Sequence, residues 1–317
     1  MATPSQPLKA EVRLVTVGSE AAGQRIDNFL SRHLKGAPRS LIYRLLRTGQ
    51  VRVNGGRAKP DVKLREGDQV RIPPVRLEER EAPPAIPPAI ATRLEAAILY
   101  EDADLLVLNK PAGLAVHGGS GLSYGVIEAL RQGRPNQPFL ELAHRLDRET
   151  SGVLLLAKRR ETLNELHRLL REGGIEKHYL ALLAGKWRGG VRRVDEALAR
   201  TGRRGEERLV EVSEEGKEAQ SEFTPLERYG EATLADVRID TGRTHQIRVH
   251  AAHLGHPVVG DPKYGDFELN RRFKVLGLRR MFLHAARVEF RLPGSGRRHR
   301  IEAPLDEELQ SVLERLR

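Results

Sequence analysis

The sequence predicts an α+β protein with two domains: a small α/β-hairpin domain and a larger domain built on a mixed, mostly antiparallel sheet. The 317 residues are enough for about two domains. Six prolines between Pro73 and Pro88 interrupt the chain. Because proline fixes its own φ and lacks a backbone donor, we expect a stiff, extended linker there. Beyond the linker, apolar runs of strand length outnumber helical patterns. The predicted parts are a disordered tail (1–11), a small domain (12–73), a linker (74–93) and a large domain (94–317).

The composition is that of a folded cytoplasmic protein. Hydrophobic residues make up 39% of the chain, which is enough for ordinary cores. No apolar run approaches the roughly 18 residues of a membrane span, and the first residues lack the basic-then-apolar pattern of a secretory signal. The chain has no cysteine, which excludes disulfides, thiolate zinc sites and cysteine nucleophiles. We expect a cytoplasmic monomer that does not contact a membrane.

The charge is distributed unevenly along the chain. The protein has 54 Lys and Arg against 43 Asp and Glu, a net charge of +11. Residues 1–73 alone hold 14 basic and 6 acidic residues, a net charge of +8. This asymmetry favours a polyanionic partner, most commonly a nucleic acid. The alternative is that the charge serves solubility alone.

In the small domain, two helices are expected first. Helical spacing relates Ile26, Phe29, Leu30 and Leu34. The next helix has an apolar face of Leu41, Ile42, Leu45 and Leu46. Its opposite face is almost purely cationic and consists of Arg39, Tyr43, Arg44 and Arg47. A strand at 51–53 then leads into a hairpin turn at Asn54-Gly55, and a second strand follows at 68–72.

The cationic helix face predicts a nucleic-acid contact. It can lie along a phosphate backbone with Tyr43 available for stacking; the alternative is a solvated face that contacts nothing. Residues 25–73 resemble the S4 RNA-binding domain in RIDNFL (25–30), in the Arg-rich second helix and in GQVRVNG (49–55). The resemblance implies RNA binding and, by itself, no chemistry.

The large domain is expected to be rich in strands, with few helices. Strands are predicted at 98–100, 105–108, 153–157, 179–183, 219–224, 232–239 and 286–291. Leucines at helical spacing predict a helix over 161–171. Another helix is expected over 244–254, ended by Gly255 in the left-handed conformation and by Pro257 just beyond.

The polar stretch HRLDRETSG (144–152) lies between an apolar run and a buried strand. Loops at strand ends often carry functional side chains on a rigid scaffold. If Arg145 and Arg148 lie close to Asp147 in space, they favour its ionised carboxylate. The alternative is that Asp147, Thr150 or Ser151 only caps a turn. Local chemistry alone slightly favours this alternative.

The same nine residues resemble the signature of the RluA-type RNA pseudouridine synthases. Further stretches resemble that family in the same order: NKPAGL (109–114), KHYLA (177–181), GRTHQIRVH (242–250), HP (256–257), GD (260–261), YG (264–265) and LHA (283–285). The resemblance covers about residues 94–317. It implies isomerisation of uridine to pseudouridine in RNA, with 23S large-subunit rRNA as the expected substrate and partner, and DNA not expected. The reaction needs no redox change or energy source, so no cofactor is expected.

The resemblance also implies roles for individual residues. Asp147 is expected to act at the ribose, either by attacking the anomeric carbon or by removing the C2′ proton. Tyr179 is expected to stack on the everted base, the alternative being core packing. Arg248 is expected to pair with Asp147, the alternative being a phosphate contact. Arg145 is expected to fill the space that the everted nucleotide leaves in the RNA. Further RNA contacts are expected from Arg148, Arg243 and His245.

Three other interpretations compete with this one. An S4-bearing ribosome-assembly factor would bind rRNA without catalysis, and an N-glycosidase would release free uracil. A metal site is suggested by His250, His253 and His256, which recur at three-residue spacing. These histidines lack the HExxH arrangement of zinc enzymes. We therefore expect no metal, and assign the histidines to RNA contacts or to hydrogen-bonded core positions.

Overall fold

A computed structural model of the chain describes residues 12–34, 36–75, 86–119, 124–204, 207–292 and 296–317. The predicted tail (1–11) and residues 76–85 of the predicted linker lie outside these ranges. The chain divides into two compact units, Met1–Pro84 and Ala85–Arg317. No helix among the described residues combines the length and apolar character needed to cross a membrane.

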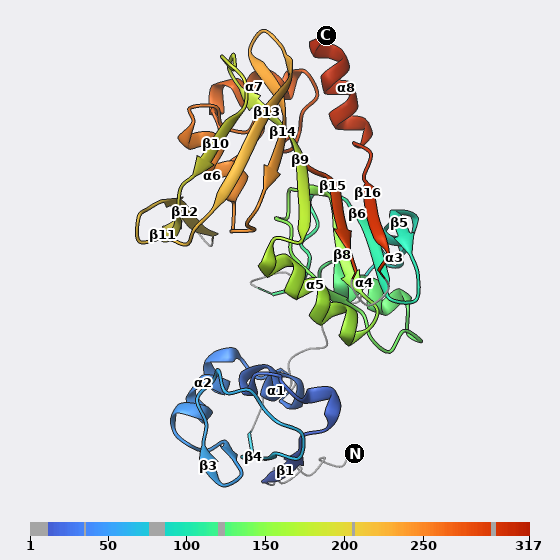
Figure 1. Cartoon of the computed structure of the whole chain (residues 1–317), viewed down its shortest axis with the longest axis vertical. Coiled ribbons are helices and arrows are strands. Elements are labelled where there is room, and N and C mark those ends of the chain that lie inside the picture. The colour runs from blue at the N-terminus through green and yellow to red at the C-terminus, as the bar shows by residue number, and fades with distance from the viewer. Residues whose placement is uncertain (1–11, 35, 76–85, 120–123, 205–206, 293–295) are drawn as a thin grey trace, which may run out of the picture. The chain divides into compact units, whose positions relative to one another are not determined.

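The first unit packs two helices against a small antiparallel sheet (Figure 1). The predicted helices are α1 (Ile26–His33) and α2 (Arg39–Arg47), and a short 3-10 helix, η1 (Ser19–Ala21), precedes them. The sheet has the order β1-β4-β2-β3, with β1 (Arg13–Thr16), β2 (Arg52–Val53), β3 (Gly56–Arg57) and β4 (Gln69–Ile72). Asn54 and Gly55 both have positive φ between β2 and β3, as a two-residue type I′ hairpin turn requires. The predicted hairpin is therefore confirmed.

The second unit is organised around one ten-stranded sheet of order β10-β13-β14-β9-β15-β8-β6-β5, in which β16 also pairs with β15 and β7 with β8. Its strands are β5 (Ile98–Glu101), β6 (Leu105–Lys110), β7 (Glu141–Leu142), β8 (Ser151–Ala157), β9 (Ile175–Ala184), β10 (Arg192–Asp195), β13 (Gln220–Arg228), β14 (Ala232–Ile239), β15 (Leu283–Arg291) and β16 (Arg298–Glu302). A separate hairpin joins β11 (Leu198–Arg204) and β12 (Glu207–Val212). Among the described ladders of the sheet, only β15 with β8 is parallel, which confirms the mostly antiparallel prediction.

The second unit has more helices than expected. Its described helices are α3 (Pro88–Ala96), α4 (Val126–Gly133), α5 (Arg160–Glu172), α6 (Gln246–His253), α7 (Phe267–Val275) and α8 (Glu307–Leu316). Only α5 and α6 were predicted. Helices α7 and α8 begin at Asp266 and Asp306, whose carboxylates accept hydrogen bonds from the first-turn amides. These two caps are visible in the sequence, and the prediction of few helices overlooked them.

The predicted linker also ends earlier than expected. Residues 88–93 belong to α3 and are not extended. Proline is tolerated at the first position of a helix, because the amide there has no partner within the helix. Leu94 is fully buried in the main core of the second unit, and its burial favours the helical conformation of this segment.

The centre of the sheet is the most buried part of the second unit. All seven residues of β8 are buried, and β9 and β15 beside it are largely buried. Side chains from the ends of these strands are therefore attached to a rigid framework. Of the predicted catalytic residues, Tyr179 lies on β9 and Asp147 lies in the loop that leads into β8.

Candidate active site

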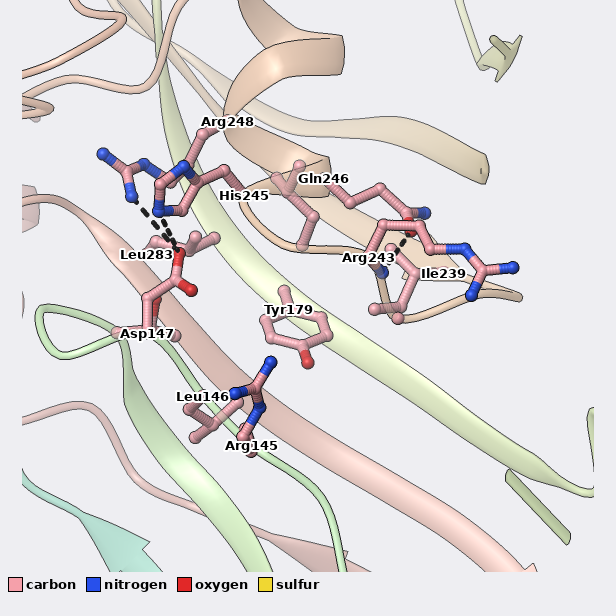
Figure 2. A pocket seen from close by; sticks show the side chains of 13 residues that line it. Arg145, Leu146, Asp147, Tyr179, Ile239, Arg243, His245, Gln246, Arg248 and Leu283 are labelled. Carbon is pink, nitrogen blue, oxygen red and sulfur yellow. Dashed lines mark hydrogen bonds and ion pairs between the residues drawn. The ribbon is translucent and has the colours of Figure 1, made fainter. Parts of the chain in front are cut away.

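Asp147, Tyr179 and Arg248 meet in one pocket of the second unit (Figure 2). Asp147 comes from the loop between β7 and β8, Tyr179 from β9, and Arg248 from α6. The inner cavity has a volume of about 80 Å³. Asp147 and Tyr179 also line a wider groove of about 1070 Å³. The pocket thus offers a small polar cavity beside a space large enough for more than one nucleotide.

Asp147 lies in a turn that leads directly into β8. The amide of Thr150 donates to the carbonyl oxygen of Asp147 at 3.1 Å. Gly152, at the second position of β8, has a φ of +108°, and a Cβ there would lie 2.2 Å from the carbonyl oxygen of Ala285. This position therefore requires glycine. The close approach holds the loop against β15 while the Asp147 side chain stays 29% exposed, within reach of a ligand.

Arg248 joins Asp147 to a second, fully buried carboxylate. Its Nη1 donates to Asp147 Oδ2 at 3.2 Å. Its Nε and Nη2 donate to the two oxygens of Asp261 at 2.7 and 2.9 Å. Burial opposes the charged guanidinium, but the hydrogen bonds and charge of Asp261, together with Asp147, raise the pKa of Arg248. Asp261 is in turn held by the amides of Lys263 and Tyr264, so Arg248 presents a fixed positive charge to Asp147.

His245 and Tyr264 complete the surroundings of Asp147. His245 adopts a left-handed conformation, with a φ of 56°, immediately before α6. Its Nδ1 lies 2.9 Å from the hydroxyl of Tyr264, and that oxygen accepts a hydrogen bond from the amide of Val210. The other ring nitrogen of His245, Nε2, lies 3.9 Å from Asp147 Oδ2. His245 was predicted to contact RNA, and the structure places it beside Asp147.

Tyr179 projects from β9 into the pocket (Figure 2). The residue is only 9% exposed, and burial, followed by the charge of Asp147, raises the pKa of its hydroxyl. The phenol therefore stays protonated at neutral pH. The residue belongs to the main core cluster and also lines both the cavity and the groove. Its ring packs in the core and faces the pocket, so the two interpretations from the sequence do not exclude each other.

Lys110 ties together two loops next to the pocket. It is fully buried, and its Nζ donates to the carbonyl oxygens of Pro111, Leu114 and Arg148 at 2.8, 2.8 and 3.1 Å. Burial lowers the pKa of this amine to about 7, against the opposing charges of Glu149 and Asp147. The motif 109–114 was recognised in the sequence, but this role of Lys110 was not predicted.

The remaining predicted RNA contacts of the second unit lie in different places. Arg145 and Arg243 are exposed and line both the cavity and the groove. Arg148 is different: its Nε donates to the carbonyl oxygen of Gly113 and lies 3.5 Å from Glu149. The cation that the structure pairs with Asp147 is Arg248, and not its sequence neighbours. Side chains of adjacent loop residues diverge, whereas α6 brings Arg248 across from 101 residues away.

The three histidines at three-residue spacing, His250, His253 and His256, do not face a common site. His250 is buried and is hydrogen-bonded to Ser221 Oγ and to the carbonyl oxygen of Glu196. His256 is hydrogen-bonded to the carbonyl oxygen of Ala184 and packs against Trp187, with ring centroids 4.9 Å apart. His253 is exposed. Among the described residues, no group of His, Asp and Glu is arranged to hold a metal ion.

The first unit has a separate basic groove, of about 800 Å³. Its charged and aromatic lining residues are Tyr43, Arg44, Arg47, Arg57 and Lys59. The hydroxyl of Tyr43 donates to Asp27 at 3.1 Å, which fixes the orientation of a ring that lines the groove. Arg39 is exposed on α2 but does not line the groove. Arg57 and Lys59 follow the hairpin turn and were not predicted, because only folding brings them beside α2.

Comparison with known proteins assigns both units to families. Residues 104–253 match the family described as RNA pseudouridylate synthase, and residues 24–70 match the S4 domain. The chain is 54% identical to "Ribosomal large subunit pseudouridine synthase C" of Escherichia coli (strain K12), over 96% of this chain and 97% of that protein. It is 49% identical to the protein of that name from Haemophilus influenzae, over 98% and 97%.

Solved structures give the same assignment. "Human RNA Pseudouridylate Synthase Domain Containing 4" superposes with a TM-score of 0.60 at 25% identity, over 72% of this chain and 96% of that one. "Human RNA Pseudouridylate Synthase Domain Containing 1" gives a TM-score of 0.57 at 27% identity, over 68% and 86%. These superpositions cover about 70% of this chain, and the N-terminal unit is matched separately by the S4 domain. From these matches and the near full-length identity, the chain belongs to the RNA pseudouridylate synthase family and carries an S4 domain.

Proposed function

We propose that this enzyme converts specific uridines of large-subunit ribosomal RNA to pseudouridine, with Asp147 as the carboxylate that acts at the ribose. The observation that carries the proposal is the position of Asp147 in the inner cavity, beside Tyr179 and 3.2 Å from Arg248. The name shared by the bacterial relatives supports large-subunit rRNA as the substrate.

The reaction is an isomerisation. The bond from uracil N1 to ribose C1′ breaks, the base rotates, a bond from C5 to C1′ forms, and the proton at C5 moves to N1. Asp147 either attacks C1′ or removes the C2′ proton, and both routes need an ionised carboxylate at this place. A glycosidase normally uses a second carboxylic acid to protonate its leaving group. The leaving uracil is a stabilised anion, so one carboxylate suffices.

Arg248, Tyr179 and Arg145 have supporting roles in this proposal. Arg248 orients the carboxylate of Asp147, because its other two nitrogens are fixed by Asp261. Tyr179 offers a ring face to the everted base and a neutral hydroxyl that can take part in proton transfer at C5. Arg145 and Arg243 are exposed at the groove, where an everted nucleotide leaves the RNA stack.

We further propose that residues 12–73 capture RNA and that residues 94–317 carry out the reaction. The exposed arginines of the first unit's groove support RNA capture. The carboxylate, arginine and tyrosine are all present and lie together, which favours catalysis over the assembly-factor alternative.

The proposal is tested by mapping pseudouridine in large-subunit rRNA from cells with and without this protein, by carbodiimide treatment and primer extension. Sites that depend on the wild-type protein and disappear with Asp147→Asn are expected. Release of free uracil would identify an N-glycosidase instead. Equal modification by both proteins would exclude Asp147 as the essential carboxylate.

A further inference from the structure

A second buried lysine lies beside the active site, two residues before Tyr179. Side chains alternate along a strand, so Lys177 and Tyr179 point to the same face of β9, whereas Glu176 and His178 are hydrogen-bonded to each other on the opposite face. Lys177 is only 7% exposed. It lines the wide groove together with Asp147, Tyr179 and Arg145.

The amine of Lys177 has no hydrogen bond or ion pair with any residue in the described ranges. Two groups that interact electrostatically with Lys177 are hydrogen-bonded to other residues. Nε2 of His144 accepts a hydrogen bond from the amide of Leu155. Asp240 accepts one from Arg238 at 2.8 Å and acts on Lys177 only through its charge. Burial lowers the pKa of Lys177, as expected for an amine that is largely removed from water and has no acceptor in the protein.

Lys110 shows what a satisfied buried lysine looks like in this protein. Its amine donates to three backbone carbonyl oxygens. Both lysines are almost completely buried, but only Lys110 has its hydrogen bonds supplied by the fold. The amine of Lys177 opens onto the groove, and the fold supplies it with no acceptor. Its environment is therefore suited to an acceptor that arrives from outside.

The groove indicates which kind of acceptor this is. Besides Lys177, it is lined by Arg145, Arg171 and Arg243, against the carboxylates of Asp147 and Asp240. An anionic oxygen compensates a buried ammonium better than a neutral carbonyl does. RNA carries one such group per nucleotide, in its phosphodiester backbone. Lys177 lies about 7 Å along β9 from Tyr179, a separation on the scale of one nucleotide.

We propose that Lys177 binds a non-bridging phosphate oxygen next to the everted uridine, so that the groove beyond Tyr179 is a subsite for the flanking nucleotide. This inference rests on the proposed function, because it takes the base at Tyr179 to be the target uracil. Lys177 is a substrate-binding residue in this proposal and takes no part in bond making. The approaching phosphate supplies the hydrogen-bond acceptor that the fold does not provide.

The test pairs a protein variant with an altered RNA. Once the target uridine is mapped, a synthetic segment is ligated into transcribed large-subunit rRNA, with one neutral methylphosphonate replacing one phosphodiester at a time on either side of that uridine. Single-turnover rates are measured for the wild-type enzyme, Lys177→Met and Lys177→Arg. Lys274→Met is the matched control, since Lys274 is exposed on α7 and does not line the groove.

With the wild-type enzyme, one methylphosphonate is expected to lower the rate at subsaturating enzyme by about 10- to 100-fold, as for a lost hydrogen bond to a charged group. Lys177→Met should show a similar loss on unaltered RNA and no further loss with that same linkage. Lys177→Arg should retain part of the activity, and Lys274→Met should behave as the wild type. Lys177→Met should also unfold at the same or a higher temperature than the wild type, whereas Lys110→Met should unfold at a lower one.

The inference would be overturned if Lys177→Met lowered the single-turnover rate by the same factor on unaltered RNA and on every methylphosphonate RNA. That result would indicate a base contact or a structural role for Lys177. A lowered unfolding temperature of Lys177→Met would also contradict it. If the wild-type enzyme fails to modify unaltered RNA, the proposed function itself is wrong.

Discussion

Arginine side chains dominate two regions of this protein, the active-site pocket of the second unit and the groove of the first, but they are held in opposite ways. In the pocket, Arg248 is 8% exposed and bonded to two carboxylates. In the groove, Arg44 and Arg47 are exposed, and within the described part of the chain their side chains have no ion pair. The same residue type is thus fixed in one place and free in the other.

The difference reflects what each region has to do. A buried charge must have its partners built in, because desolvation otherwise exceeds the gain from pairing. This gives Arg248 one position, as chemistry at a single atom requires. Exposed arginines retain their water and their conformational freedom, and they attract phosphates over a distance in a way that salt screens. The pocket should therefore respond sharply to single substitutions, and the groove gradually to charge and salt.

The largest effect is expected from Asp147→Asn. The substitution removes the ionised carboxylate with little change in volume, so the rate of pseudouridine formation should fall by at least about 10⁴-fold. Binding of rRNA should stay within about threefold, because the groove of the first unit is unchanged. Single-turnover assays and filter binding measure the two quantities. A parallel loss of both would mean that the two regions do not divide the work as described.

The next largest effect is expected from Arg248→Lys. Lysine keeps the charge but cannot donate to Asp147 and to both oxygens of Asp261 from one planar group. We expect the single-turnover rate at saturating enzyme to fall by about 10²- to 10³-fold, with unchanged RNA affinity. A circular dichroism melt serves as the control for folding. Near wild-type activity would show that charge alone is sufficient at this position.

A smaller and salt-dependent effect is expected from neutralising the groove. The full-length variant Arg44→Gln, Arg47→Gln, Arg57→Gln, Lys59→Gln should bind rRNA about 100-fold more weakly at about 100 mM salt. The slope of log affinity against log salt should be about 3 units shallower. The rate at saturating enzyme should change little, because the pocket is intact. An unchanged salt slope would argue against phosphate contacts in this groove.

The smallest effect concerns pH and His144. Burial, and after it the charge of Lys177, lowers the pKa of His144 from 6.5 to about 4. Below about pH 6.5 the unfolded chain binds a proton that the native ring does not, so stability is lost as the pH falls toward 4. Between about pH 7 and pH 5 we expect a loss of about 1 to 2 kcal/mol. Urea unfolding of the wild type and of His144→Gln at both pH values measures the change in the free energy of unfolding. An equal decrease in the two proteins would exclude His144 as the cause.

The arrangement of elements follows largely from local patterns. The helices α1, α2 and α5 and most central strands were predicted from periodicity, α6 with its end at Gly255 and Pro257, and the hairpin turn from Asn54-Gly55. The missed helices are α3, which starts within the predicted linker, α4, and α7 and α8, whose aspartate caps were overlooked. Such short helices rely on burial of a few residues, such as Leu94 and Leu309, against the rest of the unit, and local patterns carry little of that information.

For the site, the motifs named Asp147, Tyr179 and Arg248, but not what surrounds them. Asp261, Tyr264 and Lys177 belong to motifs that resemble the family, but no role was predicted for any of them. Residue types, strand periodicity and charge are properties of neighbouring positions, so the sequence alone was sufficient to predict them. Which arginine pairs with Asp147, and which buried lysine lacks a partner, depends on atoms more than 30 residues apart meeting within a few ångströms. Such meetings arise from the packing of strands and helices around one core, and only the folded chain decides them.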